Sequence, residues 1–371
     1  TGSGAASVIE FSASGTDGVE TVAITSTGSA LGQTIGTLTV DDAATASTLK
    51  KVTLAGDSKL TITSALDFAG TAVGSVVTGT IDLSESTGGS AITVGADAEN
   101  IAFTGGSGND SINVGTVSKG LVQGGVGDDT IKVTGSGVTS ASLKAGAGND
   151  LMSITGGITD GSLFGGTGND SLQAQGRVYK AHQWQYVQNG KATLSGGEGN
   201  DSLNVESYVS AELFGGKGND SLRADDNVVN ARLFGEEGND YLSANIRIDW
   251  NQEQQGVSQK DHRSAVLDGG DGDDTLYTNI YRIYANSGGF TANSNGGDGN
   301  DRIQITGGNS VKGSINITGG NGNDNIEVTN WDAGRTNQKT SDQGFRKVVI
   351  DAGADDDTIT VQGSLNTSIT T

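Results

Sequence analysis

The chain has 371 residues, including 61 Gly but no Pro and no Cys, and its 22 basic and 44 acidic side chains give a formal net charge of −22. The lack of Cys excludes a disulfide framework and thiolate metal sites, and no apolar run is long enough for a membrane-spanning helix. The negative charge disfavours nucleic-acid binding and favours cations or cationic partners.

Residues 1–100 alternate apolar with polar side chains, as in LTV at 38–40 and VTLAGDSKLTIT at 52–63. A period of two is typical of strands with one buried face. We interpret this range as motif-poor coils of a β-solenoid that continue without a linker into residues 101–371. The range contains no signal-type apolar region, and Met152 is the only Met, so we expect the chain to be a segment of a longer protein.

From residue 101 onward a six-residue motif recurs eleven times, at intervals of 19 to 34 residues. Its first copies are GGSGND (105–110) and GGVGDD (124–129), and its last is AGADDD (352–357). The sixth position is always Asp, at Asp110, Asp129, Asp150, Asp170, Asp201, Asp220, Asp240, Asp274, Asp301, Asp324 and Asp357.

Apolar residues flank each motif. The second and fourth residues after the Asp are mostly apolar, as at Ile131 and Val133, and so is the residue two places before the motif, except at Ser294. Each unit therefore predicts two short strands joined by a Gly-Asp turn. Because one unit cannot bury its own apolar face, we predict an all-β fold, a right-handed parallel β-solenoid with its turns stacked along one edge.

Stacking would place the motif Asp residues in a column, with neighbouring carboxylates about 5 Å apart. Their repulsion would be ~3 kcal/mol per adjacent pair at an effective dielectric constant near 20. Cations are therefore expected between the turns. Oxygen ligands and the lack of Cys favour calcium, and Gly allows the backbone carbonyls to turn toward the ion.

The motif, followed by x-apolar-x, resembles the calcium-binding nonapeptide of RTX (repeats-in-toxin) proteins. The resemblance implies type I secretion, an RTX-type β-roll, and about ten calcium ions shared between consecutive turns, each bound by the motif Asp side chains and by backbone carbonyls. The implied carbonyl ligands belong to Gly106, Gly108, Gly125, Gly127, Gly146, Gly148, Gly166, Gly168, Gly197, Gly199, Gly216, Gly218, Gly238, Gly270, Gly272, Gly297, Gly299, Gly320 and Gly322.

The chain departs from the usual RTX pattern in three ways. One motif occurs per coil of about 20 residues, rather than two, which implies a single row of calcium ions. Glu236 and Asp355 each replace a motif Gly, which puts those two sites in doubt. The longer intervals between motifs can also disturb the stacking.

Four insertions, at 176–193, 245–265, 277–295 and 329–347, fall between the strand after one motif and the strand before the next. They hold all three Trp and five of the seven Tyr, and they carry a net charge of +6 against −28 for the remaining chain. We expect them to emerge at one edge, opposite or beside the calcium row. Their composition is typical of contact surfaces. The candidate contacts are Trp184, Tyr186, Trp250, Tyr281, Tyr284, Trp331 and Arg335.

The insertions allow three interpretations: contacts between copies of the chain in an open array, glycan binding, or local capping of the solenoid side. The run from VTLAGDSKLTIT (52–63) through TGTIDLSES (78–86) to ITVGADAENIAFTGGSGNDSINV (92–114) resembles RTX-bearing surface-layer proteins of Gram-negative bacteria. That resemblance implies a secreted structural segment that assembles with copies of itself into a calcium-dependent surface-layer (S-layer) array, with cell-surface polysaccharide as a further partner.

Other functions remain open from the sequence. The alternatives are a calcium-rigidified stalk or a glycan-binding module of an RTX adhesin, and an ice-binding solenoid, which the irregular third motif position disfavours. The sequence has no HExxH, GxSxG or P-loop motif, and its abundant Asp residues have a simpler role in the turns. We therefore expect no enzymatic activity, no nucleic-acid partner and no membrane insertion.

Overall fold

The computed structural model describes sixteen stretches of the chain, in which all regular secondary structure is β. These are residues 7–13, 21–26, 33–42, 50–57, 60–66, 79–94, 98–99, 101–175, 191–206, 210–225, 230–247, 263–281, 290–308, 313–331, 347–363 and 367–371. They form two compact units, Thr1–Gln173 and Ala174–Thr371. Within the described stretches no helix could span a membrane.

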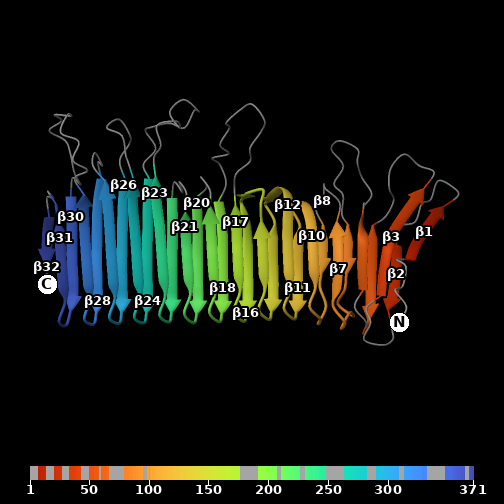
Figure 1. Cartoon of the computed structure of the whole chain (residues 1–371), viewed down its shortest axis with the longest axis horizontal. Coiled ribbons are helices and arrows are strands. Elements are labelled where there is room, and N and C mark those ends of the chain that lie inside the picture. Colours follow the sequence, from red (N-terminus) through yellow and green to blue (C-terminus); the bar gives the residue numbers. More distant parts are fainter. Residues whose placement is uncertain are drawn as a thin grey trace, which may run out of the picture. The chain divides into compact units, whose positions relative to one another are not determined.

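The first unit contains two parallel sheets, here called the A sheet and the B sheet (Figure 1). Its A sheet consists of β1 (Ser7–Ala13), β3 (Gln33–Asp42), β5 (Leu60–Leu66), β7 (Ser90–Val94), β8 (Ala98–Glu99), β10 (Ser111–Ser118), β12 (Thr130–Thr139), β14 (Leu151–Ile154), β15 (Ile158–Thr159) and β17 (Ser171–Gln175). Its B sheet consists of β2 (Thr21–Ser26), β4 (Lys51–Gly56), β6 (Thr80–Asp82), β9 (Ala102–Thr104), β11 (Leu121–Val126), β13 (Ser142–Ala147) and β16 (Gly161–Thr167).

The second unit repeats this arrangement. Its A sheet consists of β19 (Ser202–Glu206), β21 (Ser221–Asp225), β23 (Tyr241–Arg247), β25 (Thr275–Tyr281), β27 (Arg302–Gly308), β29 (Asn325–Trp331) and β31 (Thr358–Gln362). Its B sheet consists of β18 (Lys191–Glu198), β20 (Ser210–Lys217), β22 (Asn230–Glu237), β24 (Arg263–Asp271), β26 (Phe290–Asp298), β28 (Gly313–Asn321), β30 (Lys347–Ala354) and β32 (Thr367–Thr370).

Each strand pairs with the equivalent strand of the next coil. Leu203 of β19 lies opposite Leu222 of β21, and Leu213 of β20 lies opposite Leu233 of β22. The chain therefore passes from one sheet to the other in each coil, and in two coils the part in the A sheet is divided into two short strands, β7 with β8 and β14 with β15. This pairing confirms the predicted parallel β-solenoid, while its handedness stays a prediction.

The core lies between the two sheets and is built from the predicted apolar rows. Leu213, Leu233 and Leu267 of the B sheet and Leu222 of the A sheet are at most 1% exposed. Complete burial of such a side chain contributes about 1.5–3 kcal/mol to folding. Ser294, the predicted exception in the B row, is also buried at 3% exposure. The apolar period therefore identified the inward face of these strands correctly, whereas Ile359 and Val361 of β31 are only half-buried.

The strands extend further than the sequence predicts. β25 continues to Tyr281 and β26 begins at Phe290, so the insertion boundaries of 277 and 295 are wrong, as are 193, 245, 265, 329 and 347. In β25 the alternation of apolar and polar residues is interrupted, because the polar residue Thr278 occupies an inward position, where it is 1% exposed. The central parts of the four insertions lie outside the described residues.

The predicted division after residue 100 lies inside the first unit. There β9 pairs with β6 and with β11, so coils with and without the motif share one B sheet. That a single solenoid continues through the whole chain stays a prediction.

Candidate metal centre: the turns and their Asp column

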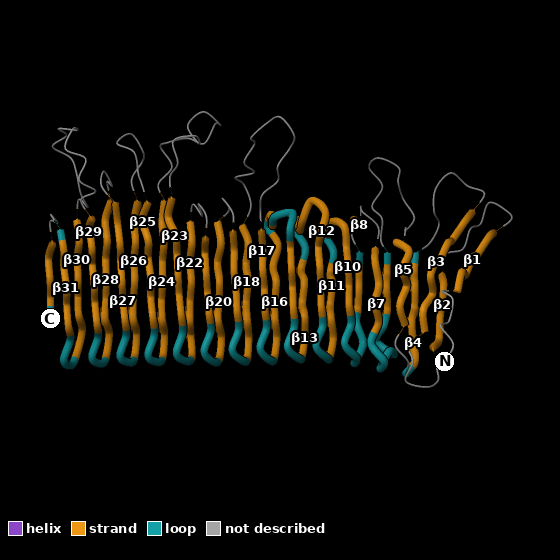
Figure 2. The backbone as a smooth tube through the Cα atoms, viewed as in Figure 1, coloured by secondary structure: helices purple, strands orange, loops and turns teal. Residues whose placement is uncertain are grey.

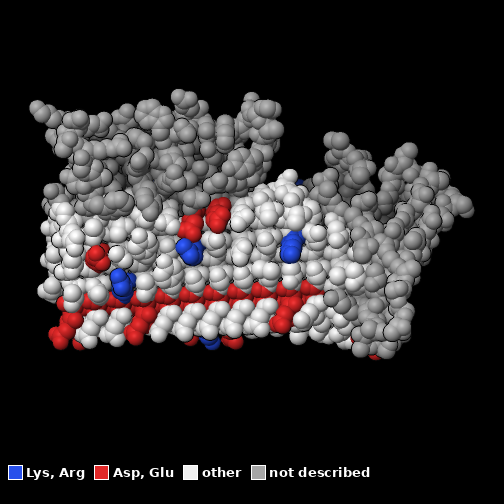
Figure 3. Space-filling model, viewed as in Figure 1, with Lys and Arg blue, Asp and Glu red and all other residues white. Residues whose placement is uncertain are grey.

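In both units the motif turns join a B strand to an A strand. Positions one to three of the motif complete the B strand, as in β20, which ends at Lys217, and the residue after the motif begins the A strand, as at Ser221 of β21. Figure 2 shows these turns along one edge of the strands, and Figure 3 shows acidic side chains gathered in a band close to them. The fold therefore brings the motif Asp residues of successive coils together within each unit.

The Asp at position six forms a buried ladder. From Asp110 to Asp324 these side chains are only 1–3% exposed, and Asp357 is half-buried. In nine of the eleven residues, all except Asp110 and Asp201, the Oδ1 atom accepts a hydrogen bond from the backbone N–H of the Asp one coil earlier, at 2.6–2.9 Å. These nine carboxylates are therefore fixed in orientation by the preceding turn.

The second carboxylate oxygen, Oδ2, has no hydrogen-bond partner in seven of these residues. Burial of a charged oxygen without a partner is unfavourable by several kcal/mol, unless it is protonated or meets a cation. The seven residues are Asp129, Asp150, Asp220, Asp240, Asp274, Asp301 and Asp324. Unpartnered oxygen atoms thus recur at the same place in coil after coil.

Burial also changes the acidity of the column. Removal from water raises the pKa of these carboxyls above the ordinary 3.8, and the hydrogen bond from the preceding N–H offsets part of this increase. The pKa is raised to about 7 at Asp129, Asp220 and Asp274, and to about 6 at Asp150, Asp240 and Asp301. Negative charge in the column is therefore unfavourable near neutral pH unless a cation compensates it.

A second ladder runs along the exposed fifth position, which is Asn or Asp. Here the side-chain oxygen accepts a hydrogen bond, at 2.6–3.0 Å, from the backbone N–H of the position-five residue in the following coil. Examples are the hydrogen bonds from the Asn239 N–H to Asn219 and from the Asp273 N–H to Asn239. The direction is opposite to that of the position-six ladder. The two ladders together pin each turn to both neighbours, which explains the regular Asn of the motif.

The motif Gly residues leave room for these oxygens. A Cβ on Gly215, at position one, would lie 2.3 Å from Oδ2 of Asp220, and a Cβ on Gly216, at position two, would lie 2.0 Å from the carbonyl oxygen of Gly197. Gly216 also has a φ of 114°, which side chains rarely allow. The carbonyl oxygens at positions two and four therefore lie close to the next turn, and their role as calcium ligands stays a prediction.

The oxygens in these turns suit a hard cation such as calcium. Across the described part of the chain, no three His, Cys, Asp or Glu side chains form one cluster, so a cation would be held by one or two carboxylates together with backbone carbonyls. The exact ligand set stays a prediction.

Two turns contain a side chain where the motif has Gly. Glu236, at position two, has a φ of 78°, and Asp355, at position four, has a φ of 85°. Both turns nevertheless keep the position-six hydrogen bonds, from Asp220 to Asp240 and from Asp324 to Asp357. The predicted departures are therefore accommodated in the stack, with strained backbone at both residues.

The first motif turn differs from the others. Gly106 and Gly108 lack the positive φ of their equivalents, and the N–H of Gly106 donates to Oδ2 of Asp110 at 3.0 Å. The sequence does not reveal this difference, because GGSGND at 105–110 matches the motif fully.

The predicted contact residues of the insertions are not tested by the structure. Trp184, Tyr186, Trp250, Tyr284 and Arg335 lie outside the described residues. Tyr281 and Trp331 end the strands β25 and β29, but their side chains are also outside the described part.

Comparison with known proteins supports the calcium interpretation. The family model of the RTX calcium-binding nonapeptide repeat matches four segments of the chain, residues 155–176, 188–206, 212–227 and 266–280. These segments include four of the motif turns described above. No curated protein and no solved structure matches the chain.

Proposed function

We propose that this chain, which is an RTX repeat protein, is part of a bacterial surface-layer protein and assembles into a cell-surface array when calcium is present. RTX repeats bind calcium and occur in secreted proteins, so the chain is a calcium-binding structural segment of a secreted protein. The surface-layer location and the array are the further steps that we propose.

The observation that carries the calcium role is the row of buried, unpartnered Oδ2 atoms, from Asp129 to Asp324. Calcium supplies the positive charge that these oxygens lack. Because the column exists only when the coils are stacked, calcium binds the folded chain far better than the unfolded chain and stabilises it. A chain of this kind is expected to fold after export, where calcium is abundant.

Replacement of one column carboxylate tests this role. Asp220→Ala removes a ligand shared by the turns before and after it, so we expect the calcium concentration at the folding midpoint to increase roughly tenfold, which corresponds to about 1.4 kcal/mol. Circular dichroism during a calcium titration measures the midpoint. Asn219→Ala is the matched control, because it removes the exposed neighbouring side chain and its hydrogen bond to the Asn239 N–H but no carboxylate. Equal midpoints for Asp220→Ala and Asn219→Ala would contradict the calcium column.

The proposal of an array is supported by the distribution of charge and aromatic residues. The four insertions carry a net +6 and all three Trp, whereas the remaining chain carries −28. Basic, aromatic segments of one copy can contact the acidic body of the next, and head-to-tail contacts of this kind extend into open arrays. Copies of the chain are therefore the proposed partners, with cell-surface polysaccharide as a second one.

Electron microscopy of the purified chain during a calcium titration tests the array. We expect ordered sheets or filaments to appear as calcium increases, and to dissolve when salt screens the charged contacts. Single rods at every calcium concentration would contradict assembly through this segment.

The outer face of the A sheet favours the alternative of a glycan-binding module. Tyr241 of β23 is 39% exposed, and the Tyr277 hydroxyl of β25 lies 3.4 Å from Oγ1 of Thr306. Thr306 in turn donates to the side-chain oxygen of Asn279 at 3.2 Å. Aromatic rings beside such polar groups can contact sugars, so a glycan screen is the decisive experiment if only single rods are observed.

A further inference from the structure

A turn of the first unit stacks on the first motif turn but has no Asp in line with the column, and it lacks the positive φ of motif positions two and four. This turn, at 83–90, joins β6 and β7 of one coil, and its Ser90 is the residue that aligns with position six. In β7, Ala91 lies opposite Ser111, which places Ser90 one coil before Asp110. Ser86 aligns with position two, because its carbonyl oxygen accepts a hydrogen bond from the Ser107 N–H at 2.9 Å. In the next coil the carbonyl oxygen of Gly106, which is at position two, accepts the equivalent hydrogen bond from the Val126 N–H at the same distance.

Two hydroxyl groups replace the carboxylate in this turn. Ser86 and Ser90 are 3% and 1% exposed, and their Oγ atoms lie 3.3 Å apart, within hydrogen-bond distance. A hydroxyl carries no charge and can donate as well as accept. The pair therefore satisfies itself inside the turn, whereas the Oδ2 atoms of the later turns have no partner within the protein.

The adjoining motif turn is also different on this side. Oδ2 of Asp110 accepts a hydrogen bond from the Gly106 N–H at 3.0 Å, and here it is Oδ1 that has no hydrogen-bond partner. The change from a hydroxyl pair to a buried carboxylate with one unpartnered oxygen thus takes place between Ser90 and Asp110.

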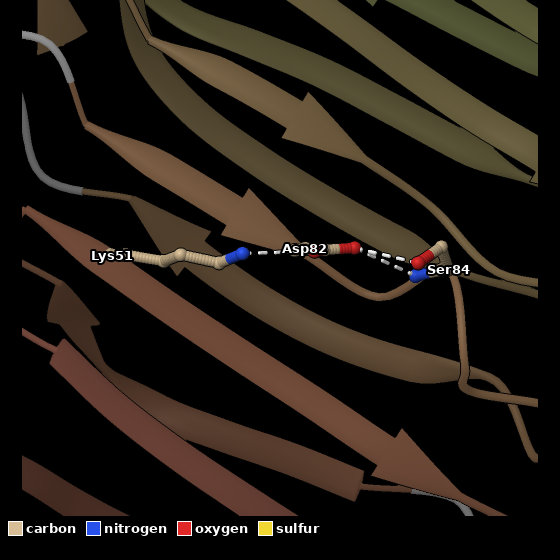
Figure 4. A network of polar contacts seen from close by, with 3 residues as sticks. All are labelled: Lys51, Asp82 and Ser84. Carbon is tan, nitrogen blue, oxygen red and sulfur yellow. Dashed lines mark hydrogen bonds and ion pairs between the residues drawn. The ribbon is translucent and has the colours of Figure 1, made fainter.

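The coil of Ser90 contains a carboxylate whose two oxygens are both bound by protein groups. In Figure 4, Asp82 lies between Lys51 and Ser84. Its Oδ2 accepts a hydrogen bond from the Lys51 ammonium at 3.2 Å, and its Oδ1 accepts a hydrogen bond from the Ser84 hydroxyl at 2.7 Å. The hydrogen bond from the Ser84 hydroxyl is the main cause that lowers the pKa of Asp82 below 3.8. This carboxylate is charged and fully partnered, in contrast to those of the column.

We infer that Ser90 ends the calcium row on the N-terminal side, so that the coil of residues 80–94 is a cation-free cap that stacks on the first motif turn. The inference rests on the proposed calcium binding by the later turns. It assigns a specific task to Ser90: to keep the buried position-six site neutral where the row stops.

The inference predicts that a carboxylate at this position extends the row. Ser90→Asp places a carboxylate one coil before Asp110. β6 pairs with β9 so that Asp82 lies opposite Thr104, which places Leu83 opposite Gly105 and makes this turn two residues longer than the motif. The full conversion, here called the triple variant, therefore combines deletion of Ser84 and Glu85 with Ser86→Gly and Ser90→Asp, which leaves Thr87, Gly88 and Gly89 unchanged.

The experiment compares the intact chain with Ser90→Ala, Ser90→Asp and the triple variant. Equilibrium dialysis with radioactive calcium counts the bound ions per chain, and thermal unfolding is recorded with and without calcium. We expect Ser90→Ala to bind as many ions as the unmodified chain and the triple variant to bind one more. Without calcium, the triple variant should unfold at a lower temperature than the unmodified chain, and calcium should restore the difference.

Three results would separate the possible failures. An unmodified chain that binds no calcium would refute the proposed function itself. If the unmodified chain binds calcium but Ser90→Ala loses an ion, Ser90 is part of a site and the cap is refuted. The cap is also refuted if the triple variant folds in calcium with an unchanged number of ions. The Ser90→Ala count needs no new carboxylate, so it decides the matter even if the triple variant does not fold.

Discussion

Glu236 shows how a single side chain can be strained and still fit the column. It has a φ of 78° at a position where the neighbouring turns have Gly, and its negative charge contributes to the raised pKa of Asp220 and Asp240, after burial as the main cause. A non-Gly residue in this region of φ is strained by roughly 1–2 kcal/mol. The presence of Glu236 at this strained position agrees with a cation in the turn that is attracted by the additional carboxylate.

Glu236→Gly should therefore stabilise the calcium-free chain. We expect the free energy of unfolding without calcium to increase by about 1 kcal/mol, because backbone strain and carboxylate repulsion are both relieved. Urea unfolding after removal of calcium measures this change. Asp355→Gly is the matched control for strain alone, since its φ is 85° and its charge does not affect the pKa of Asp220 or Asp240. A lower stability of Glu236→Gly would show that the Glu side chain makes a favourable contact in the absence of calcium.

At the scale of the element, the coil is held by side-chain ladders as well as by backbone pairing. The two ladders at motif positions five and six fix the turn, and aromatic stacking adds to the outer face of the B sheet. Phe214 and Phe234 stack with their ring centroids 5.1 Å apart, and the Arg232 guanidinium lies 5.7 Å from the Phe234 centroid. Such repetition makes each coil depend on its neighbours, as expected for a solenoid.

The Asp column predicts an unusual dependence on pH. Because folding raises the pKa of these carboxyls to about 6 or 7, the folded state binds more protons than the unfolded state between about pH 4 and pH 7. The calcium-free chain should therefore be most stable in acid and lose stability as the pH rises through 7. An increase in pKa from 3.8 to about 7 corresponds to about 4 kcal/mol per carboxyl.

Urea midpoints at pH 5 and pH 8, after dialysis against a chelating resin, test this dependence. We expect the midpoint to be lower at pH 8. With millimolar calcium the order should reverse, because calcium requires the charged carboxylate. A calcium-free midpoint that rises with pH would show that the column is ionised without a penalty.

At the scale of the whole molecule, the chain has a net charge of −22, so calcium binding changes its net charge by a measurable amount. Each bound ion removes two negative charges, so about ten ions, the number that the resemblance to RTX proteins implies, would leave a net charge near −2. A chain close to neutrality associates more readily with its copies than a strongly charged one. Calcium would thus promote both folding and assembly.

Capillary electrophoresis across a calcium titration at pH 7.5 measures this effect. We expect the mobility toward the anode to fall nearly to zero as the ions bind, and the fall to coincide with folding. Magnesium is the control, because it prefers octahedral sites and keeps several of its waters, which the buried column does not accommodate. A mobility that falls equally with both ions would indicate loose screening at the surface instead of specific sites.

The sequence alone was sufficient to predict the parallel β-solenoid and the inward row of the strands that enclose the core. The reason is that the period-two pattern and the recurring motif are local and repeated many times, so that isolated exceptions such as Ser294 do not hide them. The family match confirmed the RTX resemblance that rested on the same motif. The Asp at position six was predicted to lie in a column, and the hydrogen bonds between successive turns confirm this arrangement.

Only the tertiary structure decided what each turn does within the stack. The hydroxyl pair of Ser86 and Ser90 aligns with the column only through the pairing of β7 with β10, although its spacing of 20 residues before Asp110 was a signal in the sequence. The different turn at Gly106 and the length of β25 were also hidden, because both depend on contacts between coils. A motif specifies its local turn chemistry, whereas the partner of each oxygen is set by the coil stacked against it.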